Sequence, residues 1–382
     1  MTSRERVRAA IERRPLDRVP RYDSFWEDTL ALYQTCGLVL PTPRTLLVDG
    51  MERNIDDPVG DTFGFDLDTL FTDVSMRFPA RVLSRSDAFI VVEDRCGYTA
   101  KKFDDRASSM TFIDHKIKTQ EDWMRHRHQF RFDPTERARV DRTTFFMRTE
   151  PYPTWEGFRG LFDAVRNRNK YLAIVGYGPF EAIWRCHGWE ETLTDMLLEP
   201  EWMSEMFMAA ADLLIDTVAF MDDHGMKPDA VWINEDMGGT HTLLFAPYVY
   251  DELLFSLHHR IAEALHRRGI HLIMHSCGKI APLLPRLIEV GVDVIQALQA
   301  NTGMDVVELR AEYGKDITFF GNIAEHAFAK GPEAIEAELR RKIPVAMAGG
   351  GYIYHSDHSI PPEVDLSTYL HAMRVLDEVG AY

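Results

Sequence analysis

Cysteine is scarce in this sequence, and no two cysteines lie at the spacing of a redox or metal motif. Four are present, Cys36, Cys96, Cys186 and Cys277. Their small number and irregular spacing exclude a disulfide framework and indicate a reducing, cytoplasmic environment. Apolar runs of the roughly 20 residues that span a membrane are also missing. The amino-terminal segment is charged from Arg4 onward and lacks the apolar core of a signal peptide.

Positive charge is in deficit. The chain has 43 lysines and arginines against 60 aspartates and glutamates, which gives a formal net charge of −17. Such an acidic balance argues against nucleic acid as the main partner. Short repeats are absent, which excludes a repeat architecture. What remains is a chain of 382 residues, 45% of them hydrophobic, as is ordinary for a globular enzyme with a large core.

The second half of the sequence repeats one pattern, in which a helix ends at a glycine and a short apolar strand follows. This alternation indicates parallel β–α units. The predicted strands are residues 18–22, 69–72, 171–175, 229–233, 270–274, 292–297, 317–320 and 349–354. Eight strands of this kind predict a (β/α)8 TIM barrel over residues 1–382 as a single domain. A dinucleotide-binding sheet is disfavoured because no GxGxxG opens a helix.

The first half of the sequence carries additions to this barrel. Short strand patterns broken by turn residues predict an antiparallel β-hairpin insertion over residues 79–103. Residues 104–150 are polar and weakly patterned, and we expect a helical and loop insertion there. An exposed hairpin of this kind is compatible with a homodimer.

Four residues, His275, Ser276, Cys277 and Gly278, mark the end of one predicted strand. On an extended backbone His275 and Cys277 point the same way, because they are two positions apart. An imidazole and a thiolate on one face form half of a zinc site. The opposing interpretation is that Cys277 is a small buried hydrophobe and His275 a satisfied core histidine.

The ends of barrel strands converge on one rim, where catalytic groups of barrel enzymes lie. From the strand ends we predict a metal site of four residues, Glu235, His275, Cys277 and His358. The predicted catalytic residues are Glu235, Asp236 and His355. His355 and Asp357 are also candidates to orient an imidazole ligand. For the substrate pocket we predict Phe25, Trp26, Tyr177, Phe180, Asn322 and Tyr354, a mostly apolar lining that suits a small organic molecule.

At these residues the chain resembles the uroporphyrinogen decarboxylase superfamily, which includes zinc-dependent corrinoid methyltransferases. The matching segments are residues 3–7, 17–20, 176–181, 234–237, 275–278, 320–323, 350–353 and 358–362. The resemblance implies a (β/α)8 barrel. The decarboxylase itself is expected to carry an arginine-rich substrate loop, but residues 23–28 here read Asp-Ser-Phe-Trp-Glu-Asp. Without those arginines, the carboxylates of a large tetrapyrrole lose their bidentate partners.

The methyltransferase resemblance implies zinc held by a His-x-Cys pair and a distant cysteine. His275 and Cys277 match the pair, and His358 stands at the third position. Imidazole in place of thiolate makes zinc a stronger Lewis acid, which favours polarising an ether or alcohol oxygen. The resemblance therefore implies a demethylase that passes a methyl group to corrinoid (cobalamin) carried by a partner protein. The donor is left open among a methoxyarene, a methylamine-like compound and a sugar ether.

Two other functions stay open. A metal-free decarboxylase of a small carboxylic acid would use Arg21, His355 and His358 and would contain no zinc. A non-catalytic member of the fold would retain a ligand without forming product. Metal content distinguishes these hypotheses from methyl transfer, and so does a corrinoid protein encoded beside this chain.

Overall fold

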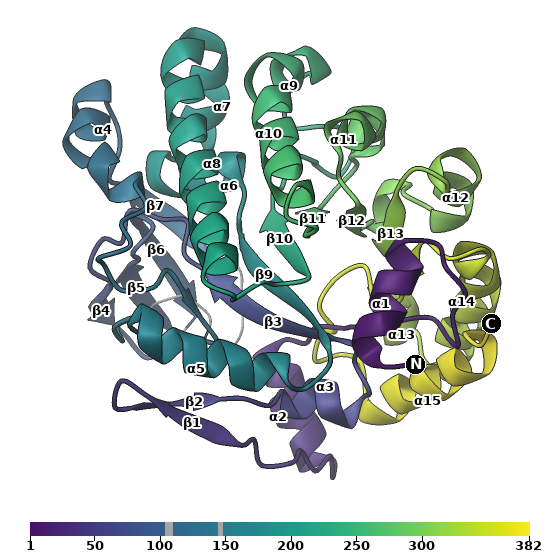
Figure 1. Ribbon diagram of the computed structural model, residues 1–382. Helices are drawn as coiled ribbons and strands as arrows, with labels where there is room; N and C mark the ends of the chain where they lie inside the picture. Colours follow the sequence, from purple (N-terminus) through teal and green to yellow (C-terminus); the bar gives the residue numbers. More distant parts are fainter. Residues whose placement is uncertain (104–109, 144–147) are drawn as a thin grey trace.

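The centre of the molecule is a closed barrel of parallel strands. The computed structural model describes residues 1–103, 110–143 and 148–382 (Figure 1). The barrel strands are β3 (Leu67–Thr72), β9 (Tyr171–Tyr177), β10 (Ala230–Asn234), β11 (His271–Ser276), β12 (Val294–Ala297), β13 (Thr318–Gly321) and β14 (Tyr352–Ile353), each parallel to its neighbour. Residues 20–22 supply the remaining strand position. The Tyr22 N–H donates to the Tyr354 carbonyl at 3.0 Å and the Asp66 N–H to the Arg21 carbonyl at 2.8 Å, which closes the barrel and confirms the predicted fold.

Helices cover the outside of this barrel in chain order. They are α2 (Glu27–Thr35), α3 (Pro58–Thr62), α5 (Trp155–Arg166), α6 (Pro179–His187), α7 (Trp189–Leu198), α8 (Pro200–Asp223), α9 (Pro247–Leu253), α10 (Phe255–His266), α11 (Leu284–Val290), α12 (Val306–Tyr313), α13 (Glu325–Ala329), α14 (Pro332–Met347) and α15 (Leu366–Val379). Short 3-10 turns precede α11 (η2, Ala281–Leu283) and α12 (η3, Ala300–Thr302). Their apolar faces and the outward-facing strand residues form one large core.

Helix α1 (Ser3–Ile11) covers the amino-terminal end of the barrel. A capping box holds its start, since Thr2 and Glu5 bond to each other's backbone N–H groups. Val7 and Ile11 pack into the barrel interior. The buried Arg6 guanidinium donates to Asp66 at 2.7 Å. Helix α1 therefore closes the amino-terminal end of the barrel. We look for a solvent-exposed active site at the opposite, carboxyl-terminal rim.

Strand β14 is shorter than predicted. Residues 349–351 were expected to begin it, but these three glycines have φ angles of 76°, 80° and 74°. Left-handed backbone of this kind cannot continue a strand. A Cβ on Gly350 would also lie 2.9 Å from the Arg13 Cα. The glycine run is therefore a turn packed against α1 and not part of the sheet.

The predicted antiparallel insertion forms a sheet of β4 (Arg81–Arg85), β5 (Phe89–Glu93), β6 (Tyr98–Phe103) and β7 (Thr111–His115). The expectation of helix and loop for 104–150 omitted β7 and β8 (Val140–Asp141), although α4 (Gln120–His126) and the 3-10 turn η1 (Arg127–Phe130) do lie there. Residues 104–109 and 144–147 of that segment are outside the described residues. A second hairpin, β1 (Thr45–Val48) and β2 (Met51–Asn54), packs near α5.

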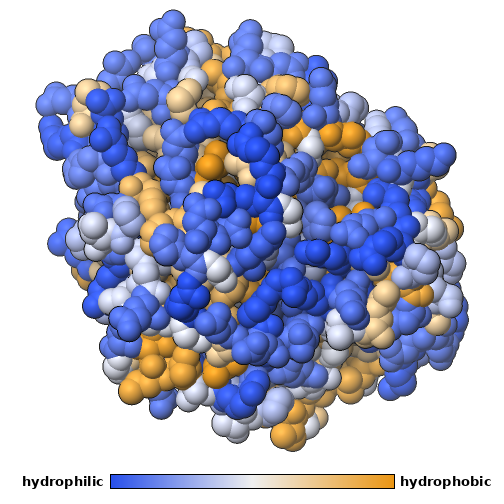
Figure 2. All heavy atoms as spheres, in the orientation of Figure 1, coloured by the Kyte–Doolittle hydropathy of each residue, from blue (hydrophilic) through white to orange (hydrophobic). Residues whose placement is uncertain are grey.

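The molecular surface agrees with the acidic composition. The face in Figure 2 is mostly hydrophilic, with small apolar patches. Within the described residues, no helix combines the length and the apolar character needed to cross a membrane.

Candidate metal centre at the barrel rim

Three potential metal ligands meet where β10 and β11 end. Asp236, His275 and Cys277 each offer one donor atom, and these atoms lie within 4.8 Å of one another. The His275 Nε2 is 3.3 Å from the Cys277 Sγ and 3.4 Å from the Asp236 Oδ1. Zinc bonds of about 2.0–2.3 Å in a tetrahedron place donor atoms about 3.3–3.6 Å apart. The three side chains therefore fit a zinc ion with an open fourth position.

Two glycines let the loops after β10 and β11 approach each other. A Cβ on Gly278 would lie 2.5 Å from the Gly238 carbonyl carbon and oxygen, and one on Gly238 would lie 2.5 Å from the Cys277 oxygen. Backbone contact at this distance excludes any side chain at either position. The approach allows the Cys277 N–H to donate to the Asp236 Oδ1 at 2.8 Å, which orients that carboxylate toward the cluster.

Gln296 fixes the orientation of the His275 ring. Its Oε1 bonds to the His275 Nδ1. A carbonyl oxygen only accepts, so Nδ1 carries a proton and Nε2 is the nitrogen that faces Asp236 and Cys277. A metal-binding imidazole is held in this way in many proteins. Sequence reasoning missed Gln296, which lies beside His275 in the β11–β12 register.

We expect Gln296→Ala to weaken zinc binding without unfolding the protein. Loss of a group that orients a ligand costs about 10–100-fold in metal affinity. Titration with a competing zinc chelator measures this change. Gln34→Ala, an exposed change on α2, is the matched control. Equal zinc affinity in wild type and Gln296→Ala would contradict the assigned role.

The charges around the cluster favour a cation. Burial alone would raise the pKa of Asp236, but hydrogen bonding and attraction to His275 lower it to about 2. Burial opposes a charged His275, yet Cys277 and Asp236 together raise its pKa well above the ordinary value. The same negative groups that hold a proton on His275 will also attract a metal ion.

Glu235, a predicted ligand and catalytic residue, points away from this cluster. It is fully buried and accepts the N–H groups of Phe180 at 3.0 Å and Glu181 at 2.9 Å. The His258 Nε2 lies 2.8 Å away, and the His258 Nδ1 is 3.0 Å from the Tyr250 hydroxyl. The structure thus gives Glu235 the role of anchoring the start of α6, and Asp236 takes the place beside His275.

Glu181 and Arg185 support Asp236 from the other side and were also missed. The Asp236 N–H donates to the Glu181 carboxylate at 3.2 Å. Burial raises the pKa of Glu181, and repulsion by Asp236 adds to this rise. The Arg185 guanidinium, 2.5 Å from the Glu181 carboxylate, opposes it. The Arg185 guanidinium lies 4.3 Å from the Tyr177 ring centre.

His358 and Asp357 do not join the cluster. His358 is partly exposed; its Nδ1 is 3.7 Å from Glu325 and its ring stacks on Trp26 at 6.0 Å. Asp357 is buried and accepts the N–H groups of Ala300 at 2.9 Å and Glu325 at 2.7 Å, so it joins two loops and orients no imidazole. Both residues follow β14 in irregular chain, where strand alternation no longer predicts direction.

His355 lies inside the barrel beside a buried carboxylate. Its ring stacks on Tyr22 at 5.9 Å, and its Nδ1 is 4.0 Å from the Asp23 Oδ1. Burial lowers the pKa of His355 to about 4. Burial also raises the pKa of Asp23 to about 7, although hydrogen bonds from Ser356 and Tyr369 oppose this. The Asp23 carboxyl therefore keeps its proton up to nearly neutral pH beside an uncharged His355, and sequence reasoning assigned no role to Asp23.

The raised pKa of Asp23 predicts a pH-dependent stability. The folded state binds this proton more tightly than the unfolded state, so stability is lost as pH rises from about 4 to about 7. We expect Asp23→Asn to reduce that loss by about 2–4 kcal/mol, since one pKa unit corresponds to about 1.4 kcal/mol. Urea unfolding at several pH values measures it. The exposed Asp163→Asn is the control, and an unchanged pH slope in Asp23→Asn would contradict the assignment.

The predicted pocket residues separate into two groups. Phe180 is fully buried against Trp189 and Phe245, and Asn322 is fully buried with its amide bonded to backbone. Tyr354 is also buried and its hydroxyl lies 3.5 Å from Asp23. These three residues support the walls in this structure. Phe25, Trp26 and Tyr177 are partly exposed.

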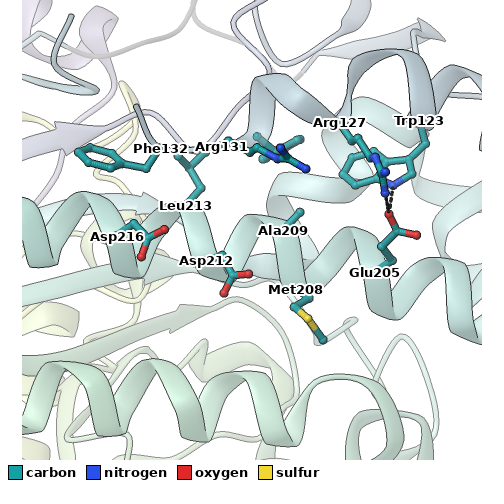
Figure 3. A pocket seen from close by; sticks show the side chains of 11 residues that line it. Trp123, Arg127, Arg131, Phe132, Glu205, Met208, Ala209, Asp212, Leu213 and Asp216 are labelled. Atoms are coloured by element: carbon teal, nitrogen blue, oxygen red, sulfur yellow. Dashed lines mark hydrogen bonds and ion pairs between the residues drawn. The ribbon is translucent and has the colours of Figure 1, made fainter. Parts of the chain in front are cut away.

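One cavity of about 380 Å³ lies well outside this rim, between the insertion and α8 (Figure 3). The Glu205 carboxylate there accepts hydrogen bonds from the Trp123 indole at 3.0 Å and from Arg127 at 2.7 Å. These contacts join α4 and η1 to α8. The cavity is therefore part of the interface between the insertion and the barrel.

A parallel barrel with a metal-compatible cluster at its carboxyl rim defines a class of barrel enzyme. The chain belongs to the uroporphyrinogen decarboxylase (URO-D) family, whose family model matches residues 157–379. The match covers the strands that carry all three clustered residues and confirms the resemblance found in the sequence.

Individual relatives are distant. Uroporphyrinogen decarboxylases from two strains of Pseudomonas aeruginosa are 28% identical over 140 residues, which is 36% of this chain and 37% of each relative. The chain thus matches little more than a third of their length. Among solved structures, a methyltransferase from Methanosarcina mazei aligns over 99% of both chains with a TM-score of 0.64 and 13% identity. That similarity establishes the shared fold.

Proposed function

We propose that this protein is a zinc-dependent methyltransferase of the O-demethylase type. It takes a methyl group from a small methoxylated molecule and transfers it to a corrinoid carried by a partner protein. The observation that carries the proposal is the Asp236, His275 and Cys277 cluster, with the His275 Nε2 directed at the other two donor atoms. The fold shared with a methyltransferase and the membership of the URO-D family support it.

Each residue of the cluster has a distinct role in this proposal. Asp236, His275 and Cys277 hold the zinc, and Gln296 orients the imidazole. Zinc bound there supplies a Lewis acid for the oxygen from which the methyl group departs. The side chains of His275 and Asp236 are 21% and 34% exposed, so substrate and partner can both approach the rim. Trp26 and Tyr177 provide apolar surface for the donor.

A decarboxylase mechanism has weaker support. The arginine that it would use, Arg21, points outward and its guanidinium bonds to Asp377 on α15 at 2.5 Å. Arg21 is therefore committed to packing on the far side of the strand from Tyr22. We place the protein in the cytoplasm, in agreement with its four free cysteines.

Methyl transfer to free cob(I)alamin tests the proposal. Zinc-loaded protein is incubated with a methoxyarene, a methylated amine or a sugar ether, and methylcobalamin is followed by absorbance. We expect product with an oxygen-bound methyl donor, and none after zinc is removed by chelation. Release of carbon dioxide from a small carboxylic acid, with no methylcobalamin from any donor, would favour the decarboxylase instead.

A further inference from the structure

Asn234, the last residue of β10, is partly exposed at the rim, whereas the four residues before it in the strand are buried. Ala230 and Trp232 belong to the cluster of side chains that fills the barrel interior. Side chains alternate along a strand, so Asn234 faces the interior as well. It is therefore the interior-facing residue of β10 that lies between Trp232 and Asp236.

The neighbours of Asn234 across the sheet are Tyr177 on β9 and His275 on β11. The residues two positions earlier on these three strands pair in the same register and pack together in the barrel interior. Tyr177, Asn234 and His275 thus form one row of interior side chains at the carboxyl ends of the strands. Neighbouring strands are about 4.8 Å apart, so the Asn234 amide is within reach of a molecule bound beside His275.

The Asn234 side-chain amide makes no hydrogen bond to any residue that the structure describes. The other two amides at this end of the barrel are already bonded, Gln296 to His275 and Asn322 to backbone groups. The backbone of Asn234 is held in place, because its carbonyl accepts the Gly178 N–H at 2.9 Å. A fixed strand end thus presents a polar side chain that is free to bind a ligand.

The chemistry of this position favours an uncharged hydroxyl group on the ligand. An amide both donates and accepts hydrogen bonds, and so does a hydroxyl, whereas an ether oxygen only accepts. A ligand carboxylate would meet the carboxylates of Asp236 and Glu181. The cation beside them, Arg185, is already bound to Glu181 at 2.5 Å. A hydroxyl therefore fits beside Asn234 better than a carboxylate or a second ether.

We propose that Asn234 selects the methyl donor by hydrogen bonding to a hydroxyl group next to its methoxy group. This inference rests on the proposed function, because the ligand is taken to be the methyl donor. The methoxy oxygen lies at the metal position beside His275, and the hydroxyl lies at Asn234 on the adjacent strand. Hydroxylated methoxyarenes and partly methylated sugars both carry this pair of neighbouring oxygens, and Asn234 determines specificity for either.

Two pairs of small molecules test the assignment by calorimetry on zinc-loaded protein without cobalamin. The first pair is 2-methoxyphenol and methoxybenzene, and the second is 2-methoxycyclohexanol and methoxycyclohexane. We expect the hydroxylated member of at least one pair to bind about five- to tenfold more tightly, which is the range of one neutral hydrogen bond. The pair that shows the larger ratio indicates whether the donor is aromatic or sugar-like.

Variants assign this preference to Asn234. Asn234→Ala removes the amide, and Asn234→Leu removes it while keeping a side chain of similar size. In both, the ratio of the two affinities within a pair should fall to about one. Asn167→Ala, an exposed change at the end of α5, should keep the wild-type ratio. The ratio cancels the difference in hydrophobicity between the two molecules, since that difference is the same in every variant.

A ratio near one in the wild type for both pairs, a ratio preserved in both Asn234 variants, or no binding of any of the four molecules would overturn the assignment. Methylcobalamin formation from the same molecules tests the proposed function separately. Binding that depends on Asn234 but yields no methyl transfer would support the assignment and contradict the methyltransferase. Methyl transfer with an affinity ratio unaffected by Asn234 would do the reverse.

Discussion

Cys277→Ser is expected to lose its zinc, and His275→Ala is expected to do the same. Wild-type protein should contain about one zinc per chain if the three donors act as a catalytic site with one open position. A serine hydroxyl is a poor zinc ligand at neutral pH because it stays protonated, whereas a thiolate is readily formed beside a metal. Elemental analysis of purified proteins measures the difference directly.

The control for this experiment is Cys36→Ser, which changes an exposed free cysteine distant in sequence from the rim. It should retain zinc at the wild-type level. Methyl transfer should be lost in Cys277→Ser and His275→Ala and preserved in Cys36→Ser. Zinc retained in both rim variants, or absent from the wild type, would refute the metal centre and with it the proposed chemistry.

The fold was predictable because each β–α unit carries its own local signals. Gly269 and Gly291 end helices, and apolar residues of β11 and β12 follow them directly. The residues 349–351 show the limit of this reasoning. Glycine permits a strand as well as a turn, and only the contact with α1 selects the turn.

The cluster of Asp236, His275 and Cys277 was predictable in part, and the choice of Glu235 over Asp236 in the sequence has a physical cause. On β10, Ala230 and Trp232 face the barrel interior while Val231 and Ile233 face the helices. Continuing this alternation turns Asp236 inward and Glu235 outward. On β11 the same alternation places His275 and Cys277 on the inward face, together with Ile273. Alternation along the strands would therefore have chosen Asp236 over Glu235 without a structure.

The alternation of side chains along a strand does not predict which residue the outward-facing Glu235 contacts. Glu235 meets His258, which lies on α10 and is brought there by tertiary packing. In the sequence His258 is one of two adjacent histidines in a helix, and nothing local marks it as buried. Likewise, His358 lies in a loop after β14, where the chain has no repeating direction.

The different positions of Glu235 and Asp236 predict opposite results for two adjacent substitutions. Glu235→Ala leaves two backbone N–H groups and the His258 imidazole unpaired in the interior, and we expect a loss of about 3–5 kcal/mol in unfolding free energy. Asp236→Asn keeps an oxygen for the Cys277 N–H and lies in a partly exposed position. Its stability should stay within about 1 kcal/mol of the wild type, while zinc affinity falls at least about tenfold because an anionic ligand is lost.

Urea unfolding and zinc titration on the same samples separate the two effects. Glu252→Ala, an exposed change on α9, controls for the loss of a glutamate and should be nearly neutral in both measurements. If Glu235→Ala folded with wild-type stability but lost zinc, Glu235 would be a ligand after all, and the carboxylate beside His275 would have been assigned wrongly. If instead each substitution affects one property alone, the two neighbouring carboxylates have separate roles: Glu235 anchors the start of α6, and Asp236 binds the metal.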